Sequence, residues 1–204
     1  YQWSGPGFSG GTTSQNAVAT AAGTYTLKVT DAVNGCTATA VTTVAQNTTA
    51  PSPTASNSTT LTCSNLTAAL TGGPAAGVTY QWSGPGFSGG TTSQNATATA
   101  PGTYTLVVTS TANSCTAAAT AAVTQNTTAP SPTANNSTTL TCSNLTAALT
   151  GAPGAGVTYQ WLGAGFSGGT TSQNATATLP GTYTLVVTST ANSCTAAATA
   201  AVTQ

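Results

Sequence analysis

Charged side chains are almost absent from this sequence of 204 residues. It contains one lysine, Lys28, one aspartate, Asp31, and no histidine, arginine, glutamate or methionine. General acid–base catalysis needs a positioned proton donor or acceptor, most often His, Glu, Asp or Lys. The two charged residues occur in only one of the repeats described below, so we expect no enzyme.

The same scarcity argues against other classes of site. Zinc is bound by clustered cysteine and histidine, and calcium by several carboxylates around one point, so we expect no metal and no cofactor. Nucleic-acid binding needs a basic surface, which one lysine does not supply. No apolar run reaches the length of a membrane-spanning helix, so we expect no membrane insertion in this stretch.

What the sequence does contain is a repeat of 79 residues. Tyr1, Tyr80 and Tyr159 each begin the tripeptide Tyr-Gln-Trp. Residues 47–125 and 126–204 are two complete copies that differ at six positions, whereas residues 1–46 match only the second half of a copy. We call these the second, third and first repeats, and predict that each complete copy is one domain.

The first repeat lacks the half that would carry about three strands, and no spare copy of that half exists elsewhere in the sequence. We therefore expect these residues to come from a longer array. The linkers, Gln46 to Pro53 and Gln125 to Pro132, are polar and contain two prolines each. Because proline restricts the backbone, we expect stiff joints and an extended row of domains.

Within a repeat, short threonine- and valine-rich runs are separated by Gly, Pro, Asn and Ser, a pattern typical of β-strands. The run from Gly102 to Thr109 alternates with period two, which points Tyr104, Leu106 and Val108 inward. Leu66 and Ala100 fall at positions that the same reasoning assigns to buried strands. About seven strands in a repeat predict an all-β chain of tandem antiparallel β-sandwiches. The predicted aromatic core is Tyr25, Tyr80, Trp82, Tyr104, Tyr159, Trp161 and Tyr183.

Each complete repeat also contains two cysteines. An alanine-rich core is small for a domain of this size, so an additional constraint is expected. Cys63 with Cys115, and Cys142 with Cys194, would each close a loop of about 50 residues. The alternative is buried free thiols. Cys36 aligns with the second cysteine of the other repeats, and its partner would precede residue 1, so we expect it to be unpaired here.

Several of these segments resemble known families. The segment Gly102 to Leu106 resembles the tyrosine corner of immunoglobulin-like domains, and Tyr80-Gln81-Trp82 resembles their strand C with its core tryptophan. Tyr-Gln-Trp-Ser-Gly-Pro, Pro-Gly-Thr-Tyr-Thr-Leu and Cys-Thr-Ala together resemble the PKD-like repeats of large Bacteroidetes surface proteins, including gliding-motility adhesins. The resemblance implies an extracellular, cell-surface location and no catalytic residue.

The predicted surface is polar but uncharged, since about a quarter of the residues are threonine. Without net charge, like molecules do not repel one another. We expect a structural fibre, filament or adhesin stalk whose partner is the chain itself, through Thr- and Ala-rich faces. Composition drift in a duplicated array is the alternative reading of this surface.

A binding role is a second hypothesis. Phe8, Phe87 and Phe166 stand in Gly-rich loops and could contact glycans or a neighbouring domain, as in a multivalent carbohydrate-binding adhesin. The alternative is that each ring folds back to cap its sandwich. Ice binding by flat threonine-rich strands is a third hypothesis, which the twist of β-sheets disfavours.

Overall fold

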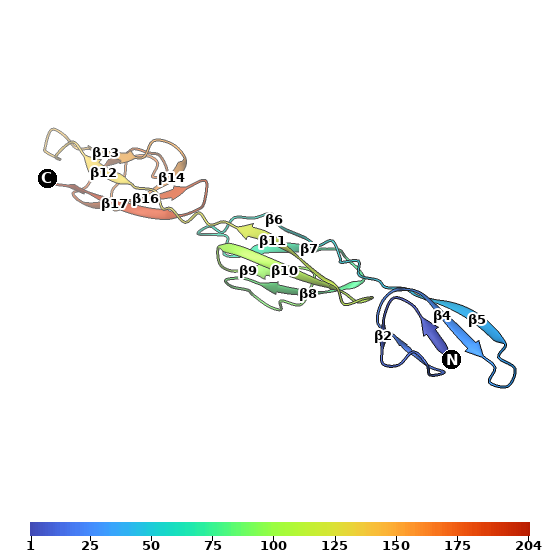
Figure 1. Ribbon diagram of the computed structural model, residues 1–204. Helices are drawn as coiled ribbons and strands as arrows, with labels where there is room; N and C mark the ends of the chain where they lie inside the picture. The colour runs from blue at the N-terminus through green and yellow to red at the C-terminus, as the bar shows by residue number, and fades with distance from the viewer. The chain divides into compact units, whose positions relative to one another are not determined.

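The computed structural model describes residues 1–204 and consists of strands that pair antiparallel (Figure 1). This confirms the predicted all-β fold class. The chain divides into two compact units, one of residues 1–50 with 112–115 and one of residues 51–111 with 116–204. No helix in the chain is long and apolar enough to span a membrane.

The first unit is built on one three-stranded sheet in the order β1-β4-β5, beside a short pair formed by β2 and β3. Its strands are β1 (Gln2–Ser4), β2 (Phe8–Ser9), β3 (Val18–Ala19), β4 (Gly23–Thr30) and β5 (Thr37–Val44). All eight residues of β5 are exposed. Val44 is 38% exposed, whereas its equivalent in the second repeat, Val123, is 3% exposed. The inner face of this sheet is therefore partly open.

The second unit contains two complete sets of six strands, one from each complete repeat. The first set is β6 (Thr54–Asn57), β7 (Ala68–Gly73), β8 (Val78–Ser83), β9 (Ala96–Ala98), β10 (Gly102–Ser110) and β11 (Thr116–Val123). The second set is β12 (Thr133–Asn136), β13 (Ala147–Ala152), β14 (Val157–Leu162), β15 (Ala175–Ala177), β16 (Gly181–Ser189) and β17 (Thr195–Val202).

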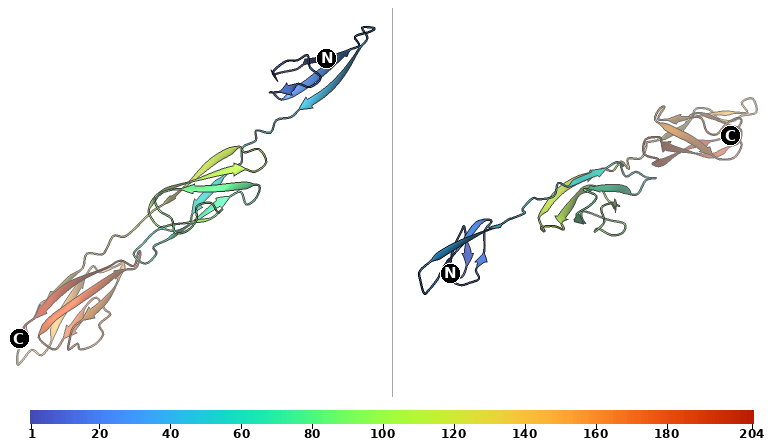
Figure 2. Two further views of the ribbon diagram at one scale, coloured as in Figure 1. Left: turned by 90° about the horizontal axis from the view of Figure 1, so that it is seen from below. Right: turned by 90° about the vertical axis from the view of Figure 1, so that its right-hand side faces the viewer.

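Each set forms two sheets, β6-β7-β9 and β8-β10-β11 in the second repeat and β12-β13-β15 and β14-β16-β17 in the third. Consecutive strands alternate between the sheets from β7 to β10, which is the Greek-key connection of immunoglobulin-like sandwiches. The strands of the third repeat, orange to red in Figure 2, lie side by side in both views. Each complete repeat thus has the architecture of an immunoglobulin-like β-sandwich.

The structure has six named strands in each complete repeat, in keeping with the predicted number of about seven. The seventh is reduced to an isolated antiparallel bridge between Phe87 and Ala98, repeated at Phe166 and Ala177. In the first repeat the same loop forms the short strand β2, which pairs with β3. A second isolated bridge is parallel and pairs Leu61 with Gln125.

Side chains from both sheets meet in one core per repeat. In the second repeat Trp82, Tyr104 and Leu106 are each at most 1% exposed and pack against Ala68 and Leu70 of the facing sheet. The third repeat has the equivalent core around Trp161, Tyr183 and Leu185. The alternation along β10 is as predicted: Tyr104, Leu106 and Val108 are buried, and the residues between them are not.

Two apolar residues do not lie where the pattern placed them. Leu66 is 70% exposed because β7 begins only at Ala68, so the strand alternation does not extend back to it. Leu179 replaces Ala100 of the second repeat and is 50% exposed, because it follows the end of β15 at Ala177. The predictions that these positions contribute to the core were wrong.

Candidate functional site: the joint between repeats

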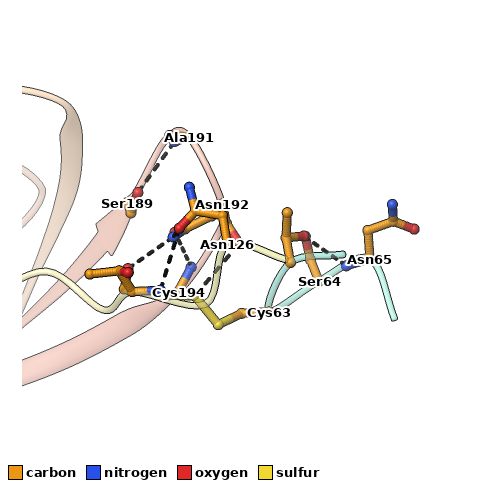
Figure 3. Close-up of a disulfide and its surroundings, with 10 residues drawn as sticks. Cys63, Ser64, Asn65, Asn126, Ser189, Ala191, Asn192 and Cys194 are labelled. Carbon is orange, nitrogen blue, oxygen red and sulfur yellow. Dashed lines mark hydrogen bonds between the residues drawn. A yellow bond between two sulfur atoms is a disulfide. The ribbon is translucent and has the colours of Figure 1, made fainter. Parts of the chain in front are cut away.

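One disulfide connects the second repeat to the third. Cys63 is bonded to Cys194, which lies 131 positions later in the sequence, with their Cα atoms 5.1 Å apart. Cys63 follows Leu61, which pairs with the end of the second repeat, whereas Cys194 precedes β17 of the third. Both residues belong to the second compact unit, so this covalent link is internal to it. Figure 3 shows the disulfide and its surroundings.

The predicted pairs Cys63–Cys115 and Cys142–Cys194 do not form, and Cys36, Cys115 and Cys142 are free thiols. The physical reason is the length of the last strand of each repeat. Leu140, two residues before Cys142, hydrogen-bonds Thr203 at the end of β17, whereas Cys194 precedes the start of that strand. Eight residues of strand extend about 26 Å, and a disulfide requires Cα atoms less than about 7 Å apart.

The loop that carries Cys194 is anchored by Asn192. Its side-chain amide donates to the Oδ1 of Asn126 at 2.9 Å and to the carbonyl of Thr128 at 2.8 Å, both in the linker. Its Oδ1 accepts from the backbone N–H of Cys194 at 3.0 Å. In Figure 3 the side chains of Asn192 and Asn126 meet beside the sulfur–sulfur bond. Because Asn192 is only 4% exposed, these bonds compensate the cost of burying its amide.

Backbone contacts complete the joint. The N–H of Cys63 donates to the carbonyl of Asn192 at 3.2 Å, and the N–H of Asn126 donates to the carbonyl of Leu61 at 2.8 Å. Asn126 is therefore bonded to the second repeat through its backbone and to the third through its side chain. The linker is held by these bonds in addition to the restriction that its prolines impose.

Residues 112–115 in the first compact unit have the same local structure as the loop at 191–194. The amide of Asn113 donates to Asn47 Oδ1 at 3.1 Å and to the carbonyl of Thr49 at 2.9 Å. The next residues, Ser114 and Ser193, have φ values of 59° and 58°. In the first repeat the equivalent residue is Gly35, with φ of 72°, a conformation that glycine adopts without strain.

Asn113 and Asn192 hold the loops at the linkers, and no motif described above includes them. A signal was available, because Asn34, Asn113 and Asn192 each stand two residues before the second cysteine of their repeat. Asparagine tolerates turns and bonds its own backbone two residues on. The hydrogen bond from Asn192 to Thr128 of the linker joins residues 64 positions apart, so no local sequence pattern predicts it.

The predicted aromatic core residues differ in burial. Tyr25, Trp82, Tyr104, Trp161 and Tyr183 are each at most 1% exposed. Tyr80 and Tyr159 pack against the edge of their cores and are partly buried. The hydroxyl of Tyr104 lies 2.7 Å from the carbonyl oxygen of Ala100 and 2.8 Å from that of Gly86, which is the tyrosine-corner arrangement.

The three loop phenylalanines fold back onto these tyrosines. The rings of Phe87 and Tyr104 meet edge to face with centroids 5.1 Å apart, and the same contact joins Phe8 to Tyr25 and Phe166 to Tyr183. This is the capping arrangement, the alternative to a contact role. The packing accounts for the recurrence of phenylalanine in this loop without a ligand.

The outer face of the sheet β8-β10-β11 carries small uncharged side chains. Thr105 lies between Ser83 and Thr120 across the strands, and Thr109 lies between Thr79 and Thr116. Val107 occupies the position that Lys28 holds in the first repeat. In the third repeat Leu162 replaces Ser83 and is 51% exposed. This face, which we call the threonine face, presents hydroxyl and methyl groups, the amide of Gln81 beside Val107, and no charge.

The remaining surface has no metal-binding cluster and contains two shallow grooves. No group of three or more His, Cys, Asp or Glu side chains is close enough to hold a metal ion. A shallow groove of about 430 Å³ lies against Leu140, Leu145 and Leu179, and a smaller one of about 210 Å³ lies against Thr20 and Val44. Neither is lined by an ionisable residue.

No protein-family model matches the chain, and no curated protein matches it. Solved structures with similar folds include murine CEACAM1b, at 14% identity and a TM-score of 0.36, over 74% of this chain and 98% of that one. Immunoglobulin domains 1–5 of Sidekick-1 match at 14% identity and a TM-score of 0.28, over 92% of this chain and 48% of that one. At these values neither function nor partners transfer to this chain.

Proposed function

We propose that this chain is a non-catalytic structural region of an extracellular fibre, filament or adhesin stalk, and that it self-associates through its threonine faces. In this proposal residues 47–125 and 126–204 are each one domain, and residues 1–46 are the second half of another. The resemblance to PKD-like repeats of Bacteroidetes surface proteins favours the same role at the cell surface.

The observation that carries the proposal is the covalent joint between repeats. Disulfides persist in oxidising surroundings, which supports an extracellular location. A bond between repeats, in contrast to one inside a repeat, resists their separation and so suits a protein that transmits force. By loop-closure entropy a loop of this length contributes about 5 kcal/mol to the free energy of unfolding.

The threonine faces support self-association because they carry no charge. Neutral faces do not repel one another. Their contacts would be apolar and hydroxyl-mediated, so salt would weaken them little. The presence of only one lysine and one aspartate, with no histidine, also supports a role without catalysis, metal or nucleic acid.

Charge placed on the threonine face tests this proposal. Val107→Lys with Val186→Lys introduces one lysine per complete repeat, at the position where the first repeat already has Lys28. We expect filaments of the unaltered chain in electron micrographs, and sedimentation of the double variant as single chains. Ala76→Lys with Ala155→Lys adds equal charge at exposed turns away from the face and is the matched control. Equal assembly of both double variants would contradict the role of the threonine face.

The second hypothesis, a multivalent carbohydrate-binding adhesin, makes a different prediction. Its candidate residues Phe8, Phe87 and Phe166 pack against tyrosines, so no exposed ring cluster favours it. Binding of the unassembled double variant to a glycan array, lost on Phe87→Ala but unchanged by Ala76→Lys, would favour this hypothesis over self-association.

A further inference from the structure

Cys142 stands in the third repeat where Cys63 stands in the second. Residues 58–67 and 137–146 are identical in sequence. The surrounding hydrogen bonds are also the same, since Leu140 N–H donates to Thr203 at 2.9 Å as Leu61 does to Thr124. Cys142 is nevertheless an exposed free thiol. The third repeat therefore contains, around Cys142, the same arrangement that surrounds Cys63 at the joint, but without the disulfide.

The other side of the joint, the loop that carries Cys194, also has an equivalent without a disulfide, the loop that carries Cys115. The Cys115 N–H donates to Asn113 Oδ1 at 3.0 Å, the same distance as from Cys194 to Asn192. Asn113 holds the preceding linker as Asn192 does. Asn192 and Cys194 are buried, whereas Asn113 and Cys115 are only partly buried. The loop of Cys115 thus has the conformation of the bonded loop of Cys194 without a disulfide. The bonded loop is the more buried of the two.

We propose that Cys142 is the attachment site for the second cysteine of a repeat that follows Gln204 through the same linker sequence. Every first cysteine of a repeat would then bond to the second cysteine of the next, which gives a ladder of disulfides across the joints. Cys115, the second cysteine of its repeat, would form the same kind of disulfide with the first cysteine of the repeat on its N-terminal side. The occupant of the Cys142 site is an Asn-Ser-Cys loop of a further repeat.

The leucine surface beside Cys142 is not part of this site. Leu145 lines the adjacent groove and is 71% exposed. Its equivalent Leu66 is 70% exposed although the neighbouring Cys63 is bonded. The joint is therefore recognised through the cysteine, the backbone of its turn and the asparagine that binds the linker.

The bond-forming step is an oxidation and needs an acceptor of two electrons. A small-molecule disulfide such as oxidised glutathione serves, and the step proceeds by thiol–disulfide exchange. The Cys142 thiolate attacks one glutathione sulfur and releases one glutathione thiolate. The incoming cysteine thiolate then attacks the Cys142 sulfur of the mixed disulfide and releases the second. Two protein thiols are oxidised to one disulfide, one glutathione disulfide is reduced to two thiols, and the two protons lost by the protein thiols end on the released glutathione thiolates.

A chain extended after Gln204 by a second copy of residues 126–204 tests the proposal. The added copy is labelled with heavy isotopes and joined by ligation, so that its peptides differ in mass from those of residues 126–204. After refolding with oxidised and reduced glutathione, the disulfides are mapped by mass spectrometry of unreduced peptides. We expect Cys63 bonded to Cys194, and Cys142 bonded to the second cysteine of the added copy. Bonding of Cys142 to Cys194, to another molecule or to nothing would overturn the proposal.

Cys142→Ser in the extended chain is the matched variant, since residue 142 is exposed and serine is similar in size. We expect Cys63–Cys194 to be retained and the number of free thiols to rise by one per chain, at the second cysteine of the added copy. If that cysteine remains oxidised in the variant, it is bonded within its own repeat, and the ladder is wrong.

Discussion

The side-chain amide of Asn192 donates a hydrogen bond to the carbonyl oxygen of Thr128 at 2.8 Å, and so ties the loop before Cys194 to the linker. Asn113 makes the same bond to Thr49 at 2.9 Å, but in a loop whose cysteine is free. The molecule thus contains the same contact with and without a disulfide beside it. That pair of contacts allows the energetic role of the joint to be measured.

Asn192→Ala should lower the free energy of unfolding by about 1–3 kcal/mol, because it leaves the buried N–H of Cys194 without its acceptor and the carbonyl of Thr128 without this donor. Asn113→Ala is the control and should cost less, since Asn113 is more exposed. Denaturant unfolding of both variants gives the comparison. Faster reduction of the disulfide by dithiothreitol is expected for Asn192→Ala alone. Equal losses and equal reduction rates would show that Asn192 does not support the joint.

The oxidised chain should contain three reactive thiols under denaturing, non-reducing conditions, at Cys36, Cys115 and Cys142. Pairing within each repeat would instead leave Cys36 as the one thiol. Titration with a thiol reagent distinguishes the two, and Cys63→Ser provides the control. That variant should gain one free thiol, at Cys194. A single thiol in the unaltered chain would refute the bond between repeats.

When the two ends of the chain are pulled apart, the disulfide should prevent the residues between its two cysteines from bearing force. Force passes from Cys63 to Cys194 through the sulfur bond, so residues 64–193 carry no load. Single-molecule force spectroscopy in the presence of a reducing agent should release additional chain across 131 positions, or roughly 430–470 Å of contour length. Cys63→Ser should extend to this greater length without the agent. Equal contour lengths for the oxidised and reduced chains would show that the disulfide does not keep force from these residues.

Tyr104→Phe should destabilise the second repeat by about 1–2 kcal/mol, because the carbonyl oxygens of Ala100 and Gly86 lose their hydroxyl partner. Tyr80→Phe removes a hydroxyl that bonds Pro74 in an exposed setting, where water replaces it, and should cost less. Thermal unfolding of the two variants decides the order. A larger loss for Tyr80→Phe would contradict the structural role assigned to the tyrosine corner.

Local pattern was enough to predict much of each repeat. Period-two alternation correctly placed Tyr104, Leu106 and Val108 inside, because in a strand successive side chains point to opposite faces. It failed at Leu66, since alternation holds only inside a strand and β7 begins two residues later. A seventh strand is present as β2 in the first repeat and as a single bridge at Phe87 and Phe166 in the complete repeats.

The sequence by itself determined that the chain is a repeat of uncharged β-rich segments, with a tyrosine corner and two cysteines in each complete copy. It could not determine which cysteines pair. Pairing depends on distance in space, and the last strand of each repeat separates its two cysteines while the linker brings one of them to the neighbouring repeat. Only the tertiary structure decided that the disulfide joins repeats, because that choice follows from the length and direction of a strand and the path of a linker.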